Sequence, residues 1–275
     1  MKDRLLVALV FVPLLFIIMF FLPPYAIAAV IAVICAICAY ELSGAIGNHE
    51  HMRITIYTVI SAALIPVGVY FNLGKLVFTA IILVLMCAVF IEAIILFNKE
   101  KRITFEHIMT TLFGGALIPF LMSGLVSLKN FREGNIFVML PVISAFITDA
   151  GSYFVGFIFG RHKAFPRISP KKTVEGYIGG FVIGTAAMIF YGIVLVNLTQ
   201  HEIRFWALML YGVIGAALTE LGDLMFSLIK REFDVKDYGR LLPGHGGMLD
   251  RFDSMVLTAP AIYLMVSFFP AIIIN

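Results

Sequence analysis

The chain has 275 residues, of which 61% are hydrophobic and 13% are charged, and its formal net charge is +3. A soluble globular domain is nearer half apolar and a quarter charged, so this composition excludes that class and indicates an integral membrane protein. We therefore predict an all-α polytopic membrane protein whose partners are the lipid bilayer and small molecules, with no nucleic acid among them.

Hydrophobic length predicts the transmembrane helices. A bilayer core about 30 Å thick needs roughly 20 apolar residues per helix. In chain order, the candidate spans are Leu5–Phe21, Tyr25–Tyr40, Ile54–Phe71, Leu76–Phe97, Ile108–Leu128, Ile136–Phe159, Val174–Leu198, Ile203–Ile229 and Met248–Ile274. The first two are short, and a re-entrant pair is the alternative to two crossings. We therefore expect about nine transmembrane helices.

The positive charges predict the orientation of these spans. With nine spans, alternate loops lie on opposite sides of the membrane. Of the 20 Lys and Arg, only Lys75, Lys129, Arg132 and Arg204 then fall on one of the two sides. Because cytoplasmic loops carry the excess of Lys and Arg, we expect a cytoplasmic N-terminus and a C-terminus on the outer side. Loops 160–173 and 230–247 would face the cytoplasm.

Carboxylates inside apolar spans predict a metal site. An aspartate at the centre of a membrane helix costs about 2.5–3.5 kcal/mol on insertion scales, so such residues are usually functional. Asp223 lies in the eighth span, and Asp250 and Asp253 share a face at the start of the ninth. We expect these three to bind Mg²⁺, with a second cation as an alternative. Hydrogen-bonded packing is the other interpretation. Asp149 is a further site candidate, whereas Glu92 is expected to be structural.

The two basic loops predict phosphate binding. Ser169-Pro170 is typical of a turn leading into a helix, with Thr173 near the helix start, and free N–H groups there favour anions. Lys171 and Lys172 strengthen this preference, although ordinary cytoplasmic flanking charges are the alternative. The second loop adds further cations, bare glycine backbone and one histidine. These residues are Lys230, Arg231, Lys236, Arg240, His245, Gly246, Gly247 and Arg251.

Small residues in the seventh span predict close helix packing. Gly176, Gly180 and Gly184 recur at four-residue spacing, and Gly179 lies beside them. Such a narrow face lets helices approach closely, either within the chain or across a homodimer. The sequence leaves both arrangements open.

The assembled motifs resemble the phosphatidate cytidylyltransferases, also called CDP-diacylglycerol synthases. The resemblance is carried by Ser227-x-Ile229-Lys230-Arg231, Lys236-Asp237-x-Gly239 and Leu242-Pro243-x-His245-Gly246-Gly247-Met248-x-Asp250-Arg251-Phe252-Asp253, together with Asp149-Ala150-Gly151-Ser152-Tyr153 and Ser169-Pro170-Lys171-Lys172-Thr173-Val174-Glu175-Gly176. It covers the C-terminal half well. We therefore divide the chain into an N-terminal transmembrane region, 1–130, and a C-terminal catalytic region, 131–275.

The resemblance implies a magnesium-dependent transfer of CMP from CTP to phosphatidate, which gives CDP-diacylglycerol and pyrophosphate. It also implies a bacterial cytoplasmic membrane with the active site facing the cytoplasm. Asp223, Asp250 and Asp253 would hold the metal, and Ser227 and His245 would orient the substrates. The remaining candidates would neutralise substrate phosphates or bind the substrates in other ways; they are Lys171, Lys172, Lys230, Arg231, Lys236, Arg240, Gly246, Gly247, Arg251, Ser169, Thr173 and Asp149.

Two other functions fit parts of the same pattern. A CTP-dependent lipid kinase would use the same groups for attack on the γ-phosphorus. An ion-coupled transporter would also place carboxylates in membrane helices. The family signature favours the cytidylyltransferase, and the roles of Glu175 and Glu220 stay open.

Overall fold

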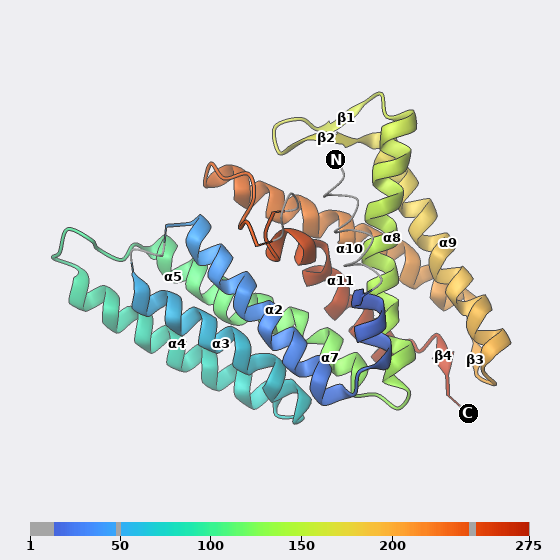
Figure 1. The fold of residues 1–275 in the computed structure, drawn as a ribbon, viewed down its shortest axis with the longest axis horizontal. Coiled ribbons are helices and arrows are strands. Elements are labelled where there is room, and N and C mark those ends of the chain that lie inside the picture. Colours follow the sequence, from blue (N-terminus) through green and yellow to red (C-terminus); the bar gives the residue numbers. More distant parts are fainter. Residues whose placement is uncertain (1–13, 48–50, 242–245, 275) are drawn as a thin grey trace. The chain divides into compact units, whose positions relative to one another are not determined.

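The computed structural model describes residues 14–47, 51–241 and 246–274, and most of these residues are helical (Figure 1). The chain divides into two compact units, each built from two separate stretches. Unit 1 comprises Met1–Arg132 and Glu232–Phe252, and unit 2 comprises Glu133–Arg231 and Asp253–Asn275. Each unit is described by itself below.

Unit 1 is a group of antiparallel helices that follow a short helical stretch at residues 14–21. Its elements are α2 (Pro24–Ala45), α3 (Met52–Tyr70), α4 (Gly74–Leu96), α5 (Phe105–Leu112), the π-turn η2 (Phe113–Leu117), α6 (Ile118–Met122) and α7 (Gly124–Lys129). Proline in the first turn favours the start of α2, because its missing N–H would have no acceptor there. A reciprocal capping box between Thr104 and His107 starts α5. Buried Gly114 and Gly115 lie in the π-turn.

Unit 2 contains the longest helices and a short hairpin. Its elements are α8 (Gly134–Phe159), β1 (Lys163–Phe165), β2 (Ser169–Thr173), α9 (Val174–Leu198), β3 (Glu202–Ile203), α10 (Phe205–Glu232), α11 (Leu249–Phe268) and β4 (Ile272–Ile273). The last residue of α10 and the first four residues of α11 belong to unit 1. Strands β1 and β2 pair antiparallel, as do β3 and β4. Tyr211 is fully buried, and its hydroxyl donates to the carbonyl of Phe269 at 2.7 Å.

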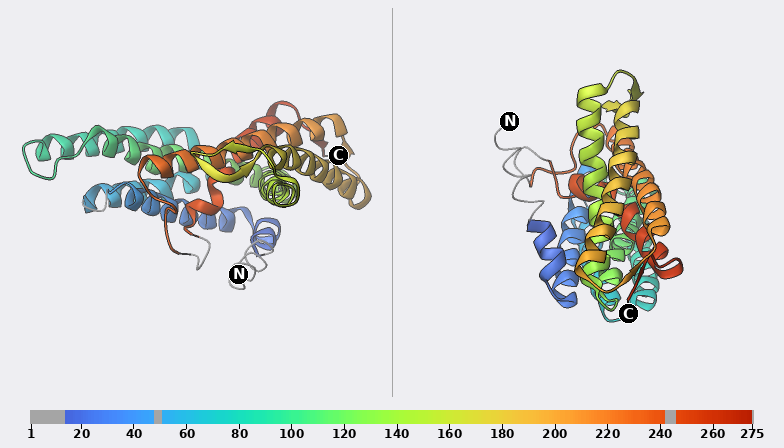
Figure 2. Two further views of the ribbon diagram at one scale, coloured as in Figure 1. Left: turned by 90° about the horizontal axis from the view of Figure 1, so that it is seen from above. Right: turned by 90° about the vertical axis from the view of Figure 1, so that its right-hand side faces the viewer.

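The glycine face of α9 packs against α8 within the chain, and the two helices run side by side in Figures 1 and 2. A Cβ on Gly179 would overlap the side chain of Val155, and one on Gly184 would overlap the hydroxyl of Thr148. A Cβ on Gly176 would lie 3.2 Å from the Cα of Gly156. The predicted close packing is therefore confirmed within the chain, and the homodimer stays a prediction.

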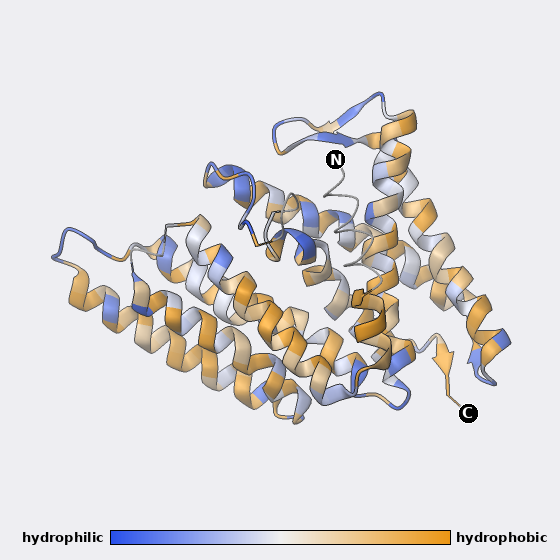
Figure 3. Cartoon of the chain, viewed as in Figure 1, coloured by the Kyte–Doolittle hydropathy of each residue, from blue (hydrophilic) through white to orange (hydrophobic). Residues whose placement is uncertain are grey.

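The described residues include seven helices that are long and apolar enough to cross a membrane. They are Pro24–Ala45, Met52–Tyr70, Gly74–Leu96, Phe105–Lys129, Gly134–Phe159, Val174–Leu198 and Phe205–Glu232, and they match seven predicted spans. The first predicted span begins outside the described residues. The ninth corresponds to α11, which is shorter than predicted and carries Asp250, Arg251 and Asp253 in its first turns. Figure 3 shows the long helices as mainly hydrophobic, with hydrophilic residues at the β1–β2 hairpin and at the C-terminal end of α10. The protein is therefore a multi-pass helical membrane protein.

Candidate active site

A group of carboxylates from three helices lies inside unit 2. Asp149 comes from α8, Glu220 and Asp223 from α10, and Asp253 from α11. Asp253 is 7% exposed and lies within electrostatic range of Asp149, Asp223 and the cation of Lys230. We call Asp149, Asp223 and Asp253 the carboxylate cluster. The sequence prediction that Asp149 belongs with the other site residues is compatible with this arrangement.

Close helix crossing positions the carboxylate cluster. A Cβ on Gly222 of α10 would lie 2.9 Å from the carbonyl oxygen of Asp253 and 3.2 Å from the Cα of Ser254, so glycine allows α10 and α11 to touch. The hydroxyl of Ser254 donates to Asp149 Oδ2 at 2.8 Å, which ties α11 to α8. The backbone N–H of Ser254 donates to Asp253 Oδ1 at 2.8 Å. Three helices are thereby held around one acidic centre.

Lys172 supplies the nearest positive charge. It lies in β2, and its Nζ forms an ion pair with Asp223 Oδ2. The same ammonium lies 5.2 Å from the centre of the Tyr177 ring, within the range of a cation–π contact. Burial lowers the pKa of Lys172, but Asp223, with smaller effects from Tyr177 and Asp149, raises it by more. Its pKa therefore lies above the usual lysine value, and the side chain stays charged at neutral pH.

The loop that carries Lys172 is a β-hairpin, which corrects the sequence prediction. Ser169-Pro170 was expected to form a turn leading into a helix, but both residues lie in strand β2. The backbone pairs with β1 instead, with Lys163 opposite Thr173 and Phe165 opposite Ser169. Local turn preference is weak, and pairing between strands overrides it.

Thr173 does stand at the helix start, as predicted. Its hydroxyl accepts from the N–H of Gly176 at 3.2 Å and so caps α9. Glu175 ties the first strand of the hairpin to the start of α9 at this same end: its carboxylate accepts from the backbone N–H groups of Arg161 at 3.1 Å and His162 at 3.2 Å. Arg231 Nε donates to the carbonyl of Ile168 at 3.1 Å, which joins the hairpin tip to the end of α10.

Glu220 forms a second polar bridge beneath the cluster. It is 4% exposed, and its Oε1 accepts from the Ser152 hydroxyl at 2.5 Å. A Cβ on Gly180 would lie 2.5 Å from that Oε1 atom and would overlap the Ser152 hydroxyl, so glycine makes room for the bridge. Glu220 Oε2 and Thr148 Oγ1 are buried and have no hydrogen-bond partner among the described residues. The bridge therefore links α8 to α10 through a gap that only glycine in α9 permits.

Asp250, in unit 1, holds the described residues 233–241 and 246–248 between α10 and α11, which we call the polar loop. Its Oδ2 accepts from the backbone N–H groups of Tyr238 and Gly247, both at 2.9 Å. The N–H of Gly247, predicted to bind substrate, therefore serves Asp250 in this structure. His245 was also predicted to orient substrate, and it lies outside the described residues.

The remaining candidates take up several positions. Ser227 donates to Asp223 Oδ1 at 3.2 Å and so belongs beside the carboxylate cluster. Lys171, Arg231 and Arg251 are exposed. The other candidates in the polar loop are Lys236, Arg240 and Gly246. Glu92 pairs with Arg53 at 3.1 Å, which agrees with its expected structural role.

Sequence analysis missed one carboxylate. Glu41 of α2 is 7% exposed, and its two oxygens accept from the N–H groups of Met248 and Leu249, each at 2.9 Å. A charged residue near the end of an apolar span was the available signal, but Glu41 has no charged neighbour in the sequence. Its partners lie more than two hundred residues away in the chain, at separations of 207 and 208.

The donors of the carboxylate cluster suit a hard divalent cation, since Mg²⁺ prefers carboxylate oxygens. Among the described residues, however, no group of three or more His, Cys, Asp or Glu side chains is arranged to hold a metal ion. The shared metal site of Asp223, Asp250 and Asp253 therefore stays a prediction. Of the three, Asp223 and Asp253 belong to unit 2 and Asp250 belongs to unit 1.

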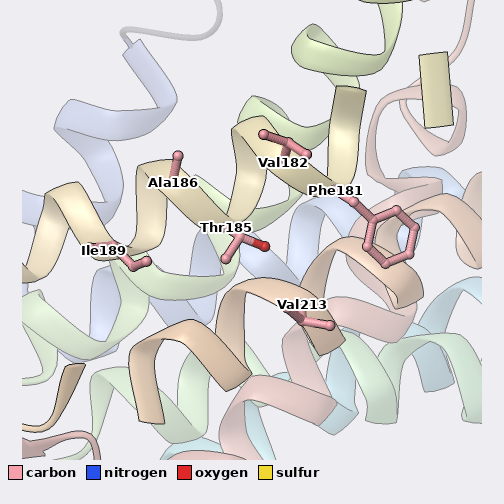
Figure 4. A pocket seen from close by; sticks show the side chains of 6 residues that line it. All are labelled: Phe181, Val182, Thr185, Ala186, Ile189 and Val213. Carbon is pink, nitrogen blue, oxygen red and sulfur yellow. The ribbon is translucent and has the colours of Figure 1, made fainter. Parts of the chain in front are cut away.

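A separate apolar groove of about 400 Å³ lies between α9 and α10 (Figure 4). It is lined by Phe181, Val182, Thr185, Ala186, Ile189 and Val213. It contains no residue of the carboxylate cluster. Its lining can accommodate hydrocarbon but offers no charge to a phosphate.

Comparison with known proteins identifies the family to which this chain belongs. The chain is similar to the phosphatidate cytidylyltransferases of Staphylococcus saprophyticus (39% identical over 134 residues, 49% of this chain and 50% of the relative), Bacillus subtilis (34% over 171 residues, 62% of each) and Mycobacterium bovis (37% over 165 residues, 60% and 52%). The chain thus spans between half and two thirds of the length of these curated relatives. The profile of the cytidylyltransferase family matches residues 2–269, nearly the whole chain. The chain therefore belongs to the cytidylyltransferase family.

Proposed function

We propose that this protein transfers CMP from CTP to phosphatidate and releases CDP-diacylglycerol and pyrophosphate. The observation that supports this most strongly is the carboxylate cluster with Lys172 and Lys230 beside it, in a chain of the cytidylyltransferase family. Curated relatives at 34–39% identity carry the name phosphatidate cytidylyltransferase. Acidic oxygens beside cations are the combination that handling of a polyphosphate requires.

In the proposed reaction, a phosphate oxygen of phosphatidate attacks the α-phosphorus of CTP. A new P–O bond forms there, and the bond from the α-phosphorus to the bridging oxygen breaks, so that pyrophosphate leaves with both bonding electrons. The protein contributes positioning and charge neutralisation and forms no covalent bond itself. A bound Mg²⁺ would neutralise phosphate oxygens as a Lewis acid.

Each residue of the site then has a defined task. Asp223 and Asp253 would hold the Mg²⁺, with Asp250 as the third predicted ligand. Lys172 and Lys230 would neutralise phosphate oxygens. We expect the exposed cations Lys171, Arg231 and Arg251, together with Lys236 and Arg240, to draw CTP to the site.

The same proposal includes the membrane topology. Nine spans, with the N-terminus in the cytoplasm and the C-terminus outside, would put the basic hairpin and the polar loop on the cytoplasmic face, where CTP is found. The positive charges support this orientation. Because the named relatives are bacterial, we propose the bacterial cytoplasmic membrane as the location.

The test is a product analysis with the purified protein in liposomes. Wild-type protein incubated with CTP, phosphatidate and Mg²⁺ should form CDP-diacylglycerol, detected by mass spectrometry, and equimolar pyrophosphate. Formation of CDP and a newly phosphorylated lipid would instead identify a CTP-dependent lipid kinase, and cation flux without any lipid product would identify a transporter.

Asp253→Asn tests the site itself. The change keeps the size of the side chain and removes its charge, so turnover should fall by about 100-fold or more. Glu92→Gln, which neutralises a buried carboxylate outside the site, is the control and should retain activity. Turnover near the wild-type value in a folded Asp253→Asn protein would refute the assignment.

A further inference from the structure

Glu41 is a carboxylate in a helix where nothing else is charged. The α2 sequence from Pro24 to Ala45 is otherwise apolar or weakly polar, and the Glu41 side chain is almost wholly buried. Burying a carboxylate is costly unless hydrogen bonds compensate for the lost water. The group must therefore have a specific partner, and that partner is the segment that leads into α11.

The two oxygens of Glu41 cap α11 from another helix. Oε1 accepts from the N–H of Met248 and Oε2 from the N–H of Leu249, both at 2.9 Å. The N–H groups in the first turn of a helix lack acceptors within that helix, and the positive end of the helix dipole favours an anion there. A carboxylate that accepts two such bonds stabilises the first turn of α11, which belongs to unit 1.

Two glycines of the polar loop close around the same carboxylate. A Cβ on Gly239 would lie 2.6 Å from Glu41 Cδ, and a Cβ on Gly247 would lie at the same distance. Real Cβ atoms essentially never approach so closely, so a side chain at either position would displace the Glu41 carboxylate. The loop is thus shaped around this group on two sides.

Asp250 anchors the loop from within. Its Oδ2 accepts from Tyr238 and from Gly247, while Gly246 adopts a left-handed conformation with φ of 82° that favours glycine. The successive N–H groups of residues 247, 248 and 249 therefore all donate to carboxylates. Removing Glu41 would take the carboxylate acceptor from the N–H groups of Met248 and Leu249, and only the N–H of Gly247 would still donate to a carboxylate, that of Asp250.

We propose that Glu41 is a positioning residue for the cytidylyl transfer. It holds the polar loop and the first turn of α11, and thereby fixes the orientation of Asp250 and Arg251, without itself touching a substrate. This inference rests on the proposed function, and it assigns a role to the N-terminal half of the chain. It also implies that CTP phosphates do not bind at the N-terminus of α11, because Glu41 already takes those N–H groups.

Glu41→Gln is the primary test, made in the full-length protein in detergent. Glutamine offers one acceptor oxygen and turns an NH₂ group toward the second donor, so one of the two bonds is lost. We expect amide hydrogen exchange at Met248 and Leu249 to accelerate by about tenfold or more. We also expect kcat to fall by about 10- to 100-fold, the range seen when a residue that orients a ligand is changed. The KM values for CTP and phosphatidate should change by less than about threefold, because Glu41 contacts neither.

Glu92→Gln is the matched control: it neutralises another buried carboxylate of unit 1, one that pairs with Arg53. It should leave both the exchange of residues 246–250 and kcat unchanged. If Glu41→Gln does not fold, Gly239→Ala provides the same test, because its methyl group would displace the Glu41 carboxylate.

Several results would overturn the inference. One is a folded Glu41→Gln protein with kcat within about twofold of wild type. A second is a loss of kcat without faster exchange in the loop, and a third is an equal loss from Glu92→Gln. Failure of the wild-type protein to form CDP-diacylglycerol is a different outcome, which refutes the proposed function. The exchange measurement, which needs no substrate, would still decide whether Glu41 holds the loop.

Discussion

Replacing Lys172 by methionine removes the cation that pairs with Asp223 and keeps a side chain of similar length. Removing one partner of a buried ion pair costs about 3–5 kcal/mol, because the other charge stays buried without compensation. Exposed pairs contribute about 0–1 kcal/mol. The Lys172 and Asp223 side chains are 22% and 23% exposed, which places this pair between the two cases but nearer the buried one. We expect each single variant, Lys172→Met or Asp223→Asn, to lose roughly 2–3 kcal/mol of stability.

The double variant Lys172→Met/Asp223→Asn separates stability from catalysis. With both charges gone, neither partner is left uncompensated, so stability should return to within about 1 kcal/mol of wild type. Cytidylyl transfer should not return, because both groups are proposed to serve the substrates. Thermal unfolding of the detergent-solubilised proteins measures the first effect, where each kcal/mol corresponds to about 2–4 °C for a chain somewhat shorter than this one. Lys171→Met, which alters the exposed neighbour, is the stability control.

Additive losses in the double variant would refute this reasoning, because they would mean that Lys172 and Asp223 do not interact. The pH dependence gives a second check. The pKa of Lys172 is higher in the folded protein than in the unfolded chain, where it is about 10.4. The ion pair therefore contributes its full stabilisation below about pH 10.4. That stabilisation is lost only as the pH rises through the higher folded pKa. Titration of Lys172 should therefore not change stability between about pH 6 and pH 9. An alkaline loss in that window that Lys172→Met abolishes would contradict the raised pKa.

Two further variants test the packing of unit 2. Gly180→Ala would force a methyl group to within 2.5 Å of Glu220 Oε1, so we expect about 1–3 kcal/mol of destabilisation by overpacking. Unchanged thermal unfolding of this variant would show that α9 can move away from α8 and α10 at no cost. Glu175→Gln weakens the acceptor for the backbone N–H groups of Arg161 and His162, and hydrogen exchange at those two amides should accelerate while helix α9 stays protected. Uniform acceleration through α9 would instead mean that Glu175 stabilises the helix and not the hairpin.

Much of the fold could be predicted from local sequence. A membrane helix is defined by the apolar length of its own segment, and seven predicted spans appear as helices with ends shifted by only a few residues. The close packing of the α9 glycines was also predictable, because small residues at helical spacing create a narrow face whatever lies opposite. Turn preference was less reliable: Ser169-Pro170 forms part of a strand because β1 lies beside it.

The candidate site also has features that local sequence predicts and features that depend on tertiary packing. Motifs close together in the sequence, from Ser227 to Asp253, were sufficient to indicate the cytidylyltransferase family, which the family profile confirms. Its place inside an apolar span also pointed to Asp149, but the contact of Asp149 with Ser254 depends on how α8 and α11 pack. Glu41 is the clearest case, since its carboxylate has no local partner and its donors lie at the far end of the chain.

Hydrophobic length and charge are properties of each segment alone, so they indicate a multi-pass helical membrane protein with acidic and basic groups suited to phosphate chemistry before any packing is known. Tertiary structure decided which buried carboxylate accepts from which N–H or cation. That choice depends on helices separated in sequence being brought within hydrogen-bond distance, which glycines such as Gly180 and Gly222 permit.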